Sequence, residues 1–213
     1  MNKVFKVEIT NGEPDGYRYA TQMDLPARGA AYTQALRQAR VANFVKMETE
    51  VLQVYHGPVT ADMVEGAPLS DLNTLALELA NLDDLQLAGL EGMLQIYREH
   101  HSGGPIPTED LHSMIDHSGE CMVAGNIRSD QELGRFLDDS EMIPDDVTGL
   151  LHLSKGYEEL YSDLLTACAK QWRRESCGVF TSQGYVEPDM DLVPFLLGQE
   201  QEQQESPGMG MTP

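Results

Sequence analysis

The chain has 213 residues, of which 35 are Asp or Glu and 14 are Lys or Arg, so its formal net charge is −21. This charge argues against direct contact with nucleic acid or an anionic membrane, because neutralising phosphates requires Lys and Arg. The three cysteines form no paired framework, no apolar run reaches the roughly 20 residues of a membrane span, and the first residues lack a signal-peptide core, so we expect a cytoplasmic protein without cofactor or metal.

Residues 1–58 predict a small α+β domain. Alternating apolar residues over 4–9 indicate a strand, and a turn-rich segment then leads to a second strand around 17–21. The segment 30–45 is rich in Ala, Gln and Arg and predicts a helix. Apolar residues at 51–55 supply a third strand. The order of these elements is ββαβ.

The sequence 57–68 (GPVTADMVEGAP) has the composition of a linker. After it, residues 69–126 predict an acidic helical domain. Ser70 is expected to cap its first helix, which carries regularly spaced leucines, and Thr108 is expected to begin a later, shorter one. A brief strand is expected at 121–124.

Asp83 and Gln86 form a capping box, which predicts the start of a second helix in this domain. Gly89 and Gly92 lie inside that helix, where each costs about 1 kcal/mol relative to Ala. We therefore expect another part of the backbone to approach this helix closely.

Residues 130–146 (DQELGRFLDDSEMIPDD) hold seven carboxylates and one arginine. Ser129 and Glu132 form a capping box, and apolar residues at spacings of three and four give the stripe of a short amphipathic helix. The residues of this stripe are Leu133, Phe136 and Leu137. The carboxylates are therefore expected on a folded scaffold, facing water.

Residues 127–192 predict a third, acidic helical domain. In it Pro144 interrupts the helical pattern before a long helix over 154–172. The segment 179–186 predicts a closing hairpin, and the Gln/Glu/Gly/Met-rich tail 198–213 is expected to be disordered. The long helix carries aromatic residues expected in the core, or alternatively at a dimer contact: Tyr157, Tyr161 and Trp172.

Three segments, in this order, resemble the ArdA-type antirestriction proteins. Residues 72–76 (LNTLA) are similar to the Leu-Asn-x-Leu-Ala start of the family's central helical region. Residues 132–137 (ELGRFL), then 143–146 (IPDD) and Leu150, resemble its acidic helix, Ile-Pro turn and following acidic segment. Residues 180–186 (FTSQGYV) resemble its closing hairpin.

The chain departs from this family after the Ile-Pro turn. Relatives commonly carry Tyr-Ile-Asp-Tyr and then Gly-Arg-Asp, where this chain has LHLS at 151–154 and YSD at 161–163. The C-terminal tail is additional. The resemblance covers about residues 70–187, and the N-terminal ββαβ unit fits the family's small first domain in outline.

The resemblance implies an elongated α+β protein with a small N-terminal ββαβ domain, mainly helical acidic domains and a short C-terminal hairpin. It implies a homodimer that mimics bent B-form DNA, occupies the DNA groove of type I restriction–modification enzymes and catalyses no reaction. The candidate partner-binding residues are Asp130, Glu132, Asp138, Asp139, Glu141, Asp145, Asp146, Glu158, Glu159 and Asp163.

The distribution of charge is compatible with that role. Residues 1–46 carry seven basic and four acidic side chains, whereas residues 47–169 carry four basic and twenty-four acidic ones, a net −20. DNA shows one charge per about 1.7 Å of axis, so this charge corresponds to about 34 Å, or about ten base pairs, and a dimer would double it. Such a contact would be independent of DNA sequence and sensitive to salt.

Other functions find less support. His112 and His117 lie five residues apart rather than at the i, i+4 spacing of a helical metal site, and the sequence has no GxSxG, P-loop or GxGxxG motif. Cys177 follows Arg173 and Arg174, which could lower the pKa of its thiol, but the sequence favours a passive cysteine at a helix end. The alternatives left open are a solvated acidic face, an adaptor for another basic DNA-binding or conjugation protein, and a hydrolase using two carboxylates.

Overall fold

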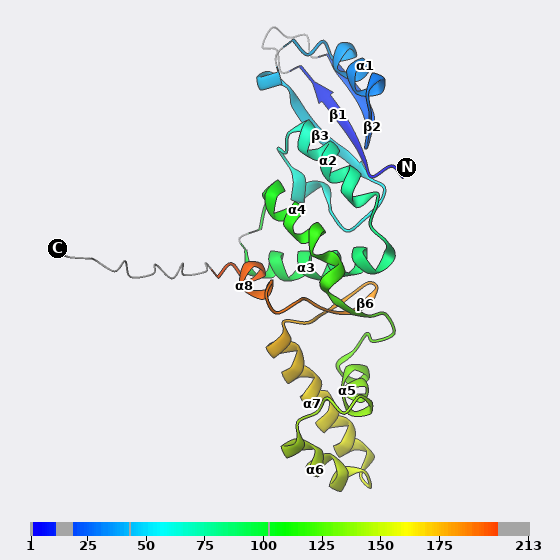
Figure 1. Cartoon of the computed structure of the whole chain (residues 1–213), viewed down its shortest axis with the longest axis vertical. Coiled ribbons are helices and arrows are strands. Elements are labelled where there is room, and N and C mark those ends of the chain that lie inside the picture. The colour runs from blue at the N-terminus through cyan, green and yellow to red at the C-terminus, as the bar shows by residue number, and fades with distance from the viewer. Residues whose placement is uncertain (1, 12–18, 43, 102, 200–213) are drawn as a thin grey trace, which may run out of the picture.

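The computed structural model describes residues 2–11, 19–42, 44–101 and 103–199, and of Val45 only the backbone. The chain forms an elongated molecule of the α+β class, in which the N-terminal sheet and the helices that follow residue 129 lie at opposite ends (Figure 1). This class is the one expected from the sequence.

The N-terminal unit is the predicted ββαβ arrangement. It contains β1 (Phe5–Thr10), β2 (Ala20–Leu25), α1 (Ala30–Gln38) and β3 (Glu48–Val54). The strands form an antiparallel sheet in the order β2-β1-β3, with β1 in the centre. Every second side chain of β1 is buried, as the period of a strand requires: Phe5, Val7 and Ile9. The turn expected after β1 lies mostly outside the described residues.

Helix α1 ends seven residues before the expected end at residue 45. Arg40 adopts a left-handed conformation with φ of 52°, and the Val41 amide donates to the Leu36 carbonyl at 3.0 Å. This is the hydrogen bond of a Schellman cap, which ends a helix. Glycine usually occupies the left-handed position, so an arginine there gave no signal in the sequence. A short 3-10 turn, η1 (Phe44–Lys46), precedes β3.

The interpretation of residues 57–68 as a linker is wrong. Val59, Met63 and Val64 are buried in the core, and the last two belong to the 3-10 helix η2 (Ala61–Val64). The Ile106 amide donates to the Met63 carbonyl at 2.7 Å and ties this segment to the helical region. Despite its glycines and prolines, this connection packs against the core and is not a flexible linker.

Three helices form the central region: α2 (Leu69–Leu79), α3 (Asp84–His100) and α4 (Thr108–Asp116). The prediction that Ser70 caps the first of them is wrong, because α2 already begins at Leu69, after Pro68. The Ser70 hydroxyl donates instead to the Asp71 carboxylate at 2.9 Å. The expected apolar side chains of α2 and α4 are buried: Leu72, Leu75, Leu79, Leu111, Met114 and Ile115.

The capping box at the start of α3 is confirmed. The Asp83 carboxylate accepts from the amides of Leu85 and Gln86 at 3.0 and 2.9 Å, and the Gln86 side chain accepts from the Asp83 amide at 3.0 Å. Each side chain satisfies a free amide, and together they fix the first residue of the helix.

The two glycines of α3 make room for neighbouring segments. A Cβ atom at Gly89 would overlap the carbonyl oxygen of Ser118, which is the close backbone approach expected from the sequence. At Gly92 the neighbour is the Val186 side chain rather than a backbone. One strand of a second sheet therefore packs directly on α3.

That second sheet combines segments from two parts of the chain. Strands β4 (Met122–Ala124), β5 (Val179–Thr181) and β6 (Gly184–Glu187) form an antiparallel sheet in the order β4-β6-β5. The β5–β6 hairpin and the short strand β4 were expected from the sequence. The pairing of β4 with β6 was not expected. Neighbouring residues of β6 enter different cores: Val186 joins the core around α3, and Tyr185 joins that of the last helices.

The last helices are α5 (Asp130–Asp139), α6 (Asp145–Ser154) and α7 (Glu158–Ser176). The expected helix over 154–172 begins four residues late, because Ser154 ends α6. Its aromatic residues divide: Tyr161 and Trp172 are half-buried, whereas Tyr157 is 71% exposed, so its expected place in the core is wrong.

A terminal one-turn helix, α8 (Val193–Leu196), returns to α3, where the ring of Phe195 lies 5.9 Å from that of Tyr97. The larger core contains residues from both 1–58 and 69–126, and the second sheet draws strands from both sides of residue 126. The domain boundaries expected there stay predictions. The tail expected at 198–213 lies almost wholly outside the described residues.

We predict that Gly134→Ala destabilises the protein by about 1–3 kcal/mol, as overpacking does. A methyl at Gly134 of α5 would overlap the carbonyl of Leu165 in α7. Gly149 of α6 is the matched control, because a methyl there meets open space and Ala is the better helix former. Urea unfolding followed by circular dichroism should therefore show a lower midpoint for Gly134→Ala alone. Equal midpoints for both variants would contradict the close packing of α5 on α7.

Candidate functional site on an acidic surface

The ten carboxylates singled out from the sequence all lie on α5, α6, α7 or the turns between them. Asp130 and Asp138 are half-buried. The other eight are exposed: Glu132, Asp139, Glu141, Asp145, Asp146, Glu158, Glu159 and Asp163. The structure therefore brings them into one helical unit and turns most of them toward water.

Asp130 has a structural role. Its Oδ1 atom lies 2.7 Å from Nε of Arg173 in α7, and the two side chains are only 18% and 30% exposed. The guanidinium of Arg173 also lies 4.7 Å from the ring centroid of Phe180. Asp130 thus links α5 to α7 and the second sheet, and its charge is compensated.

Asp138 and Glu132 also bind groups of their own unit. Asp138 accepts a 2.5 Å hydrogen bond from the hydroxyl of Tyr161, and this bond, with burial, raises the pKa of the phenol to about 12. Ser129 caps α5 as expected, accepting from the Glu132 amide at 3.2 Å. The Glu132 carboxylate accepts a hydrogen bond from the backbone amide of Arg128 at 2.7 Å. The expected capping box would have used the amide of Ser129 instead.

Helix starts position four of the exposed carboxylates. Asp145 and Asp146 occupy the first turn of α6, and Glu158 and Glu159 occupy that of α7. Negative side chains are stabilised there by the helix dipole, so these positions suit both the fold and a display of charge. Glu141 follows α5 in a left-handed conformation with φ of 55°.

Sequence reasoning missed the larger concentration of charge, which lies in residues 47–126 and so includes β3 as well as the central helices. Residues 127–177 contain eleven acidic and six basic side chains, a net −5, whereas residues 47–126 contain fourteen acidic side chains and one arginine, a net −13. A count by segment would have found it. That arginine, Arg98, pairs with Asp62 at 3.0 Å. The exposed acids of this region are Glu48, Glu50, Asp62, Glu65, Asp83, Asp84, Glu99, Glu109, Asp116 and Glu120.

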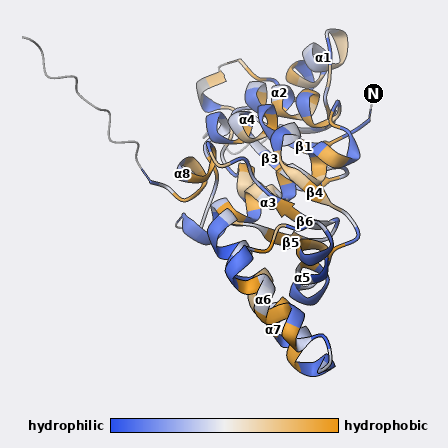
Figure 2. Ribbon diagram, turned by 60° about the horizontal axis from the view of Figure 1, so that its bottom comes forward, coloured by the Kyte–Doolittle hydropathy of each residue, from blue (hydrophilic) through white to orange (hydrophobic). Residues whose placement is uncertain are grey.

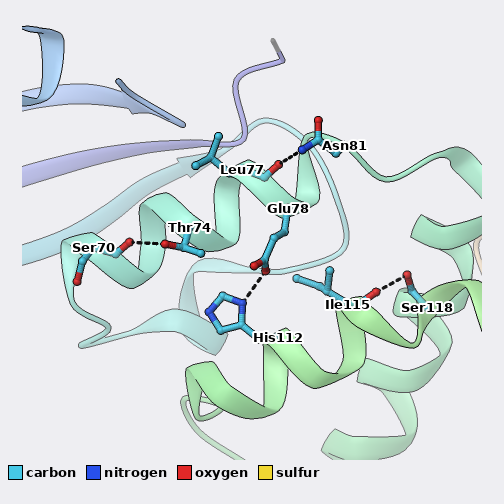
Figure 3. A network of polar contacts seen from close by, with 8 residues as sticks. All are labelled: Ser70, Thr74, Leu77, Glu78, Asn81, His112, Ile115 and Ser118. Carbon is cyan, nitrogen blue, oxygen red and sulfur yellow. Dashed lines mark hydrogen bonds and ion pairs between the residues drawn. The ribbon is translucent and has the colours of Figure 1, made fainter. Parts of the chain in front are cut away.

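Some central carboxylates hold helices together instead. Glu78 of α2 lies 2.5 Å from Nδ1 of His112 in α4, and the two side chains point toward each other between the helices (Figure 3). Asp110 of α4 accepts a 2.6 Å hydrogen bond from Tyr97 of α3. These acids therefore contribute to packing.

The histidines and cysteines form no reactive cluster in the described part of the chain. No group of three or more His, Cys, Asp or Glu residues there could hold a metal ion. Burial raises the pKa of the Cys177 thiol, so the hypothesis of a lowered pKa beside Arg173 and Arg174 is wrong. Burial likewise raises the pKa of Cys121 to about 11.

No described helix combines the length and the apolar character needed to cross a membrane. No protein-family model matches the chain, and no curated protein matches it in sequence. The resemblance to ArdA-type proteins therefore rests on the segments 72–76, 132–137, 143–146 with Leu150, and 180–186 alone.

We predict that Asp130→Asn lowers the free energy of unfolding by about 1–3 kcal/mol, because it removes a charged hydrogen bond to a half-buried arginine. Asp139→Asn, on the exposed side of the same helix, should change it by less than about 0.5 kcal/mol. Thermal or urea unfolding of both variants measures the difference. If the two variants unfold alike, Asp130 is a surface charge like the others.

Proposed function

We propose that this protein is a DNA mimic that binds type I restriction–modification enzymes and blocks their DNA groove. The observation that carries the proposal is that exposed carboxylates occur both within residues 47–126 and on α5–α7. These parts follow one another along an elongated molecule (Figure 1). Of the ten carboxylates on α5–α7, one, Asp130, forms an ion pair with a described residue. Most of the charge is therefore available to a partner.

The mechanism follows from how proteins hold DNA. A DNA groove presents Lys and Arg side chains at positions set by the phosphates, and these contacts fix orientation without reading bases. Carboxylates carried on packed helices can bind the same cations, and because the helix backbone is already ordered it loses little entropy on binding. The mimic would then occupy the groove whatever DNA sequence the enzyme recognises.

Self-association is the second part of the proposal. The residues at the α6–α7 junction with large, exposed apolar side chains are Leu150, Leu153, Tyr157 and Leu160. Leu150 and Leu153 lie one turn apart on α6, Tyr157 directly precedes α7, and Leu160 lies in the first turn of α7. Hydropathy colouring shows apolar stretches on both helices (Figure 2). A two-fold contact brings the same residues of both subunits together, so these apolar side chains would cover one another.

The acidic surface is tested by competition with DNA for a type I methyltransferase at low salt. The triple variant Glu158→Gln, Glu159→Gln, Asp163→Asn should raise the half-inhibitory concentration at least tenfold, about 1.4 kcal/mol of binding free energy. The control applies the same charge change to Glu200, Glu202 and Glu205, outside the described residues. Added salt should weaken inhibition steeply.

Unchanged DNA binding by the methyltransferase at micromolar protein would reject this target. A pull-down that retains a different basic DNA-binding or conjugation protein would then favour the adaptor function, because the same carboxylates would serve it.

The dimer is tested by sedimentation equilibrium. We predict that the double variant Leu153→Ser, Tyr157→Ser weakens the dimer at least tenfold, because these two side chains are 79% and 71% exposed at the centre of the apolar surface. Met190→Ser is the control, since Met190 is similarly exposed, at 60%, but lies elsewhere. A wild-type protein that remains monomeric at 100 μM (about 2 mg/ml) would contradict the proposed contact.

A further inference from the structure

A groove of about 740 Å³ runs beside β3. Residues 48–51 of β3 form one wall, Phe44 and Met47 close one end, and residues 61–68 form the opposite wall. Successive side chains of a strand point to opposite faces of its sheet. Because four consecutive residues of β3 line the groove, it follows the edge of the strand rather than one face.

One edge of β3 faces away from β1. In the order β2-β1-β3 this strand pairs with β1, and in the described part of the chain it has no other strand partner. In an antiparallel pair, alternate residues direct their N–H and C=O groups away from the neighbouring strand. No described residue hydrogen-bonds to the backbone of residues 49–53 from the groove. Such an edge can accept one more strand.

The opposite wall is fixed in place. Met63 and Val64 of η2 are 5% and 2% exposed, and the Met63 carbonyl accepts from the Ile106 amide at 2.7 Å. This packing fixes η2, which also contacts β3, so the groove is a feature of the folded core. Phe44, 63% exposed, offers an apolar contact at the end of the groove.

The charges of the groove select a basic occupant. Glu50 and Glu65 line it as exposed carboxylates, while Asp62 is already paired with Arg98. Glu50 also lies directly opposite Glu8 of β1 in the sheet register, and like charges in that arrangement repel. A lysine or arginine placed beside Glu50 would relieve this repulsion.

We propose that this groove, termed the β3 groove, binds an extended basic segment of a partner protein as an added strand. Its backbone pairs with residues 49–53, its Lys or Arg side chains meet Glu50 and Glu65, and an apolar side chain covers Phe44. The β3 groove and α5–α7 lie toward opposite ends of the molecule (Figure 1). The inference does not require the proposed DNA mimicry, because it concerns a strand edge and not the carboxylates of α5–α7, although Glu50 and Glu65 also belong to the acidic residues counted above.

The test uses the full chain and a synthetic peptide, acetylated and amidated Lys-Val-Lys-Val-Lys-Val, with backbone amide resonances as the readout. We expect saturable shifts at residues 49–53 and at Glu65. The same peptide with every amide N-methylated keeps its charge but cannot pair as a strand, so it should bind at least tenfold more weakly.

Matched variants separate the groove from general attraction to an acidic protein. Glu50→Gln with Glu65→Gln should weaken peptide binding at least tenfold, whereas Glu158→Gln with Glu159→Gln should change it less than twofold. The proposal would be overturned if both pairs of variants lost peptide affinity equally or if the shifts were confined to α5–α7. It would also be overturned if no binding were detected at 1 mM peptide. Shifts at residues 49–53 that appear with protein concentration alone would assign the edge to a second copy and overturn it as well.

Discussion

The alternation of side chains along β6 is the constraint on which the rest of the structure depends. Val186 points to one side of the sheet and fills the space left by Gly92 of α3, while Tyr185 points to the other and joins the core of α5–α7. A shift of β6 by one residue would exchange these two side chains between the cores. Val186 lies so close to Gly92 that a Cβ there would overlap it, and Tyr185 is fully buried on the other side, so the register is fixed from both sides. This small sheet thereby joins two otherwise separate helical regions.

Packing also explains how the acidic helices stay folded. Like charges on one surface repel, and the repulsion must be offset by burial. In α5–α7 the backbones approach at Gly134 and Leu165, and leucines from α5, α6 and α7 fill the core beneath the carboxylates. Asp130 and Arg173 contribute one half-buried ion pair. In this unit the attractive contacts are therefore buried, whereas the repulsion between like charges acts at the surface.

The parts of the fold that depend on local chemistry could be predicted from the sequence. Asp83 and Ser129 are helix caps as expected, because a cap requires only its own neighbours along the chain. Pairings between distant segments could not be predicted: nothing near Gly92 indicates Val186 as its neighbour. Residues 57–68 were misjudged because their composition matches a linker, whereas their burial depends on distant helices. For the site, the sequence located exposed acids, but it could not separate compensated ones such as Asp130 from the rest.

The topology of the second sheet has a consequence for how this protein can vary. β4 leads into α5, and α7 leads back into β5, so α5–α7 leave and rejoin one sheet at its two outer strands, which both pair with β6 (Figure 1). They form an insertion whose two ends are held close together by main-chain pairing of β4, β6 and β5. Insertions anchored in this way can be lengthened, shortened or exchanged while the scaffold keeps its fold. The length of this molecule can therefore be changed by altering α5–α7 alone.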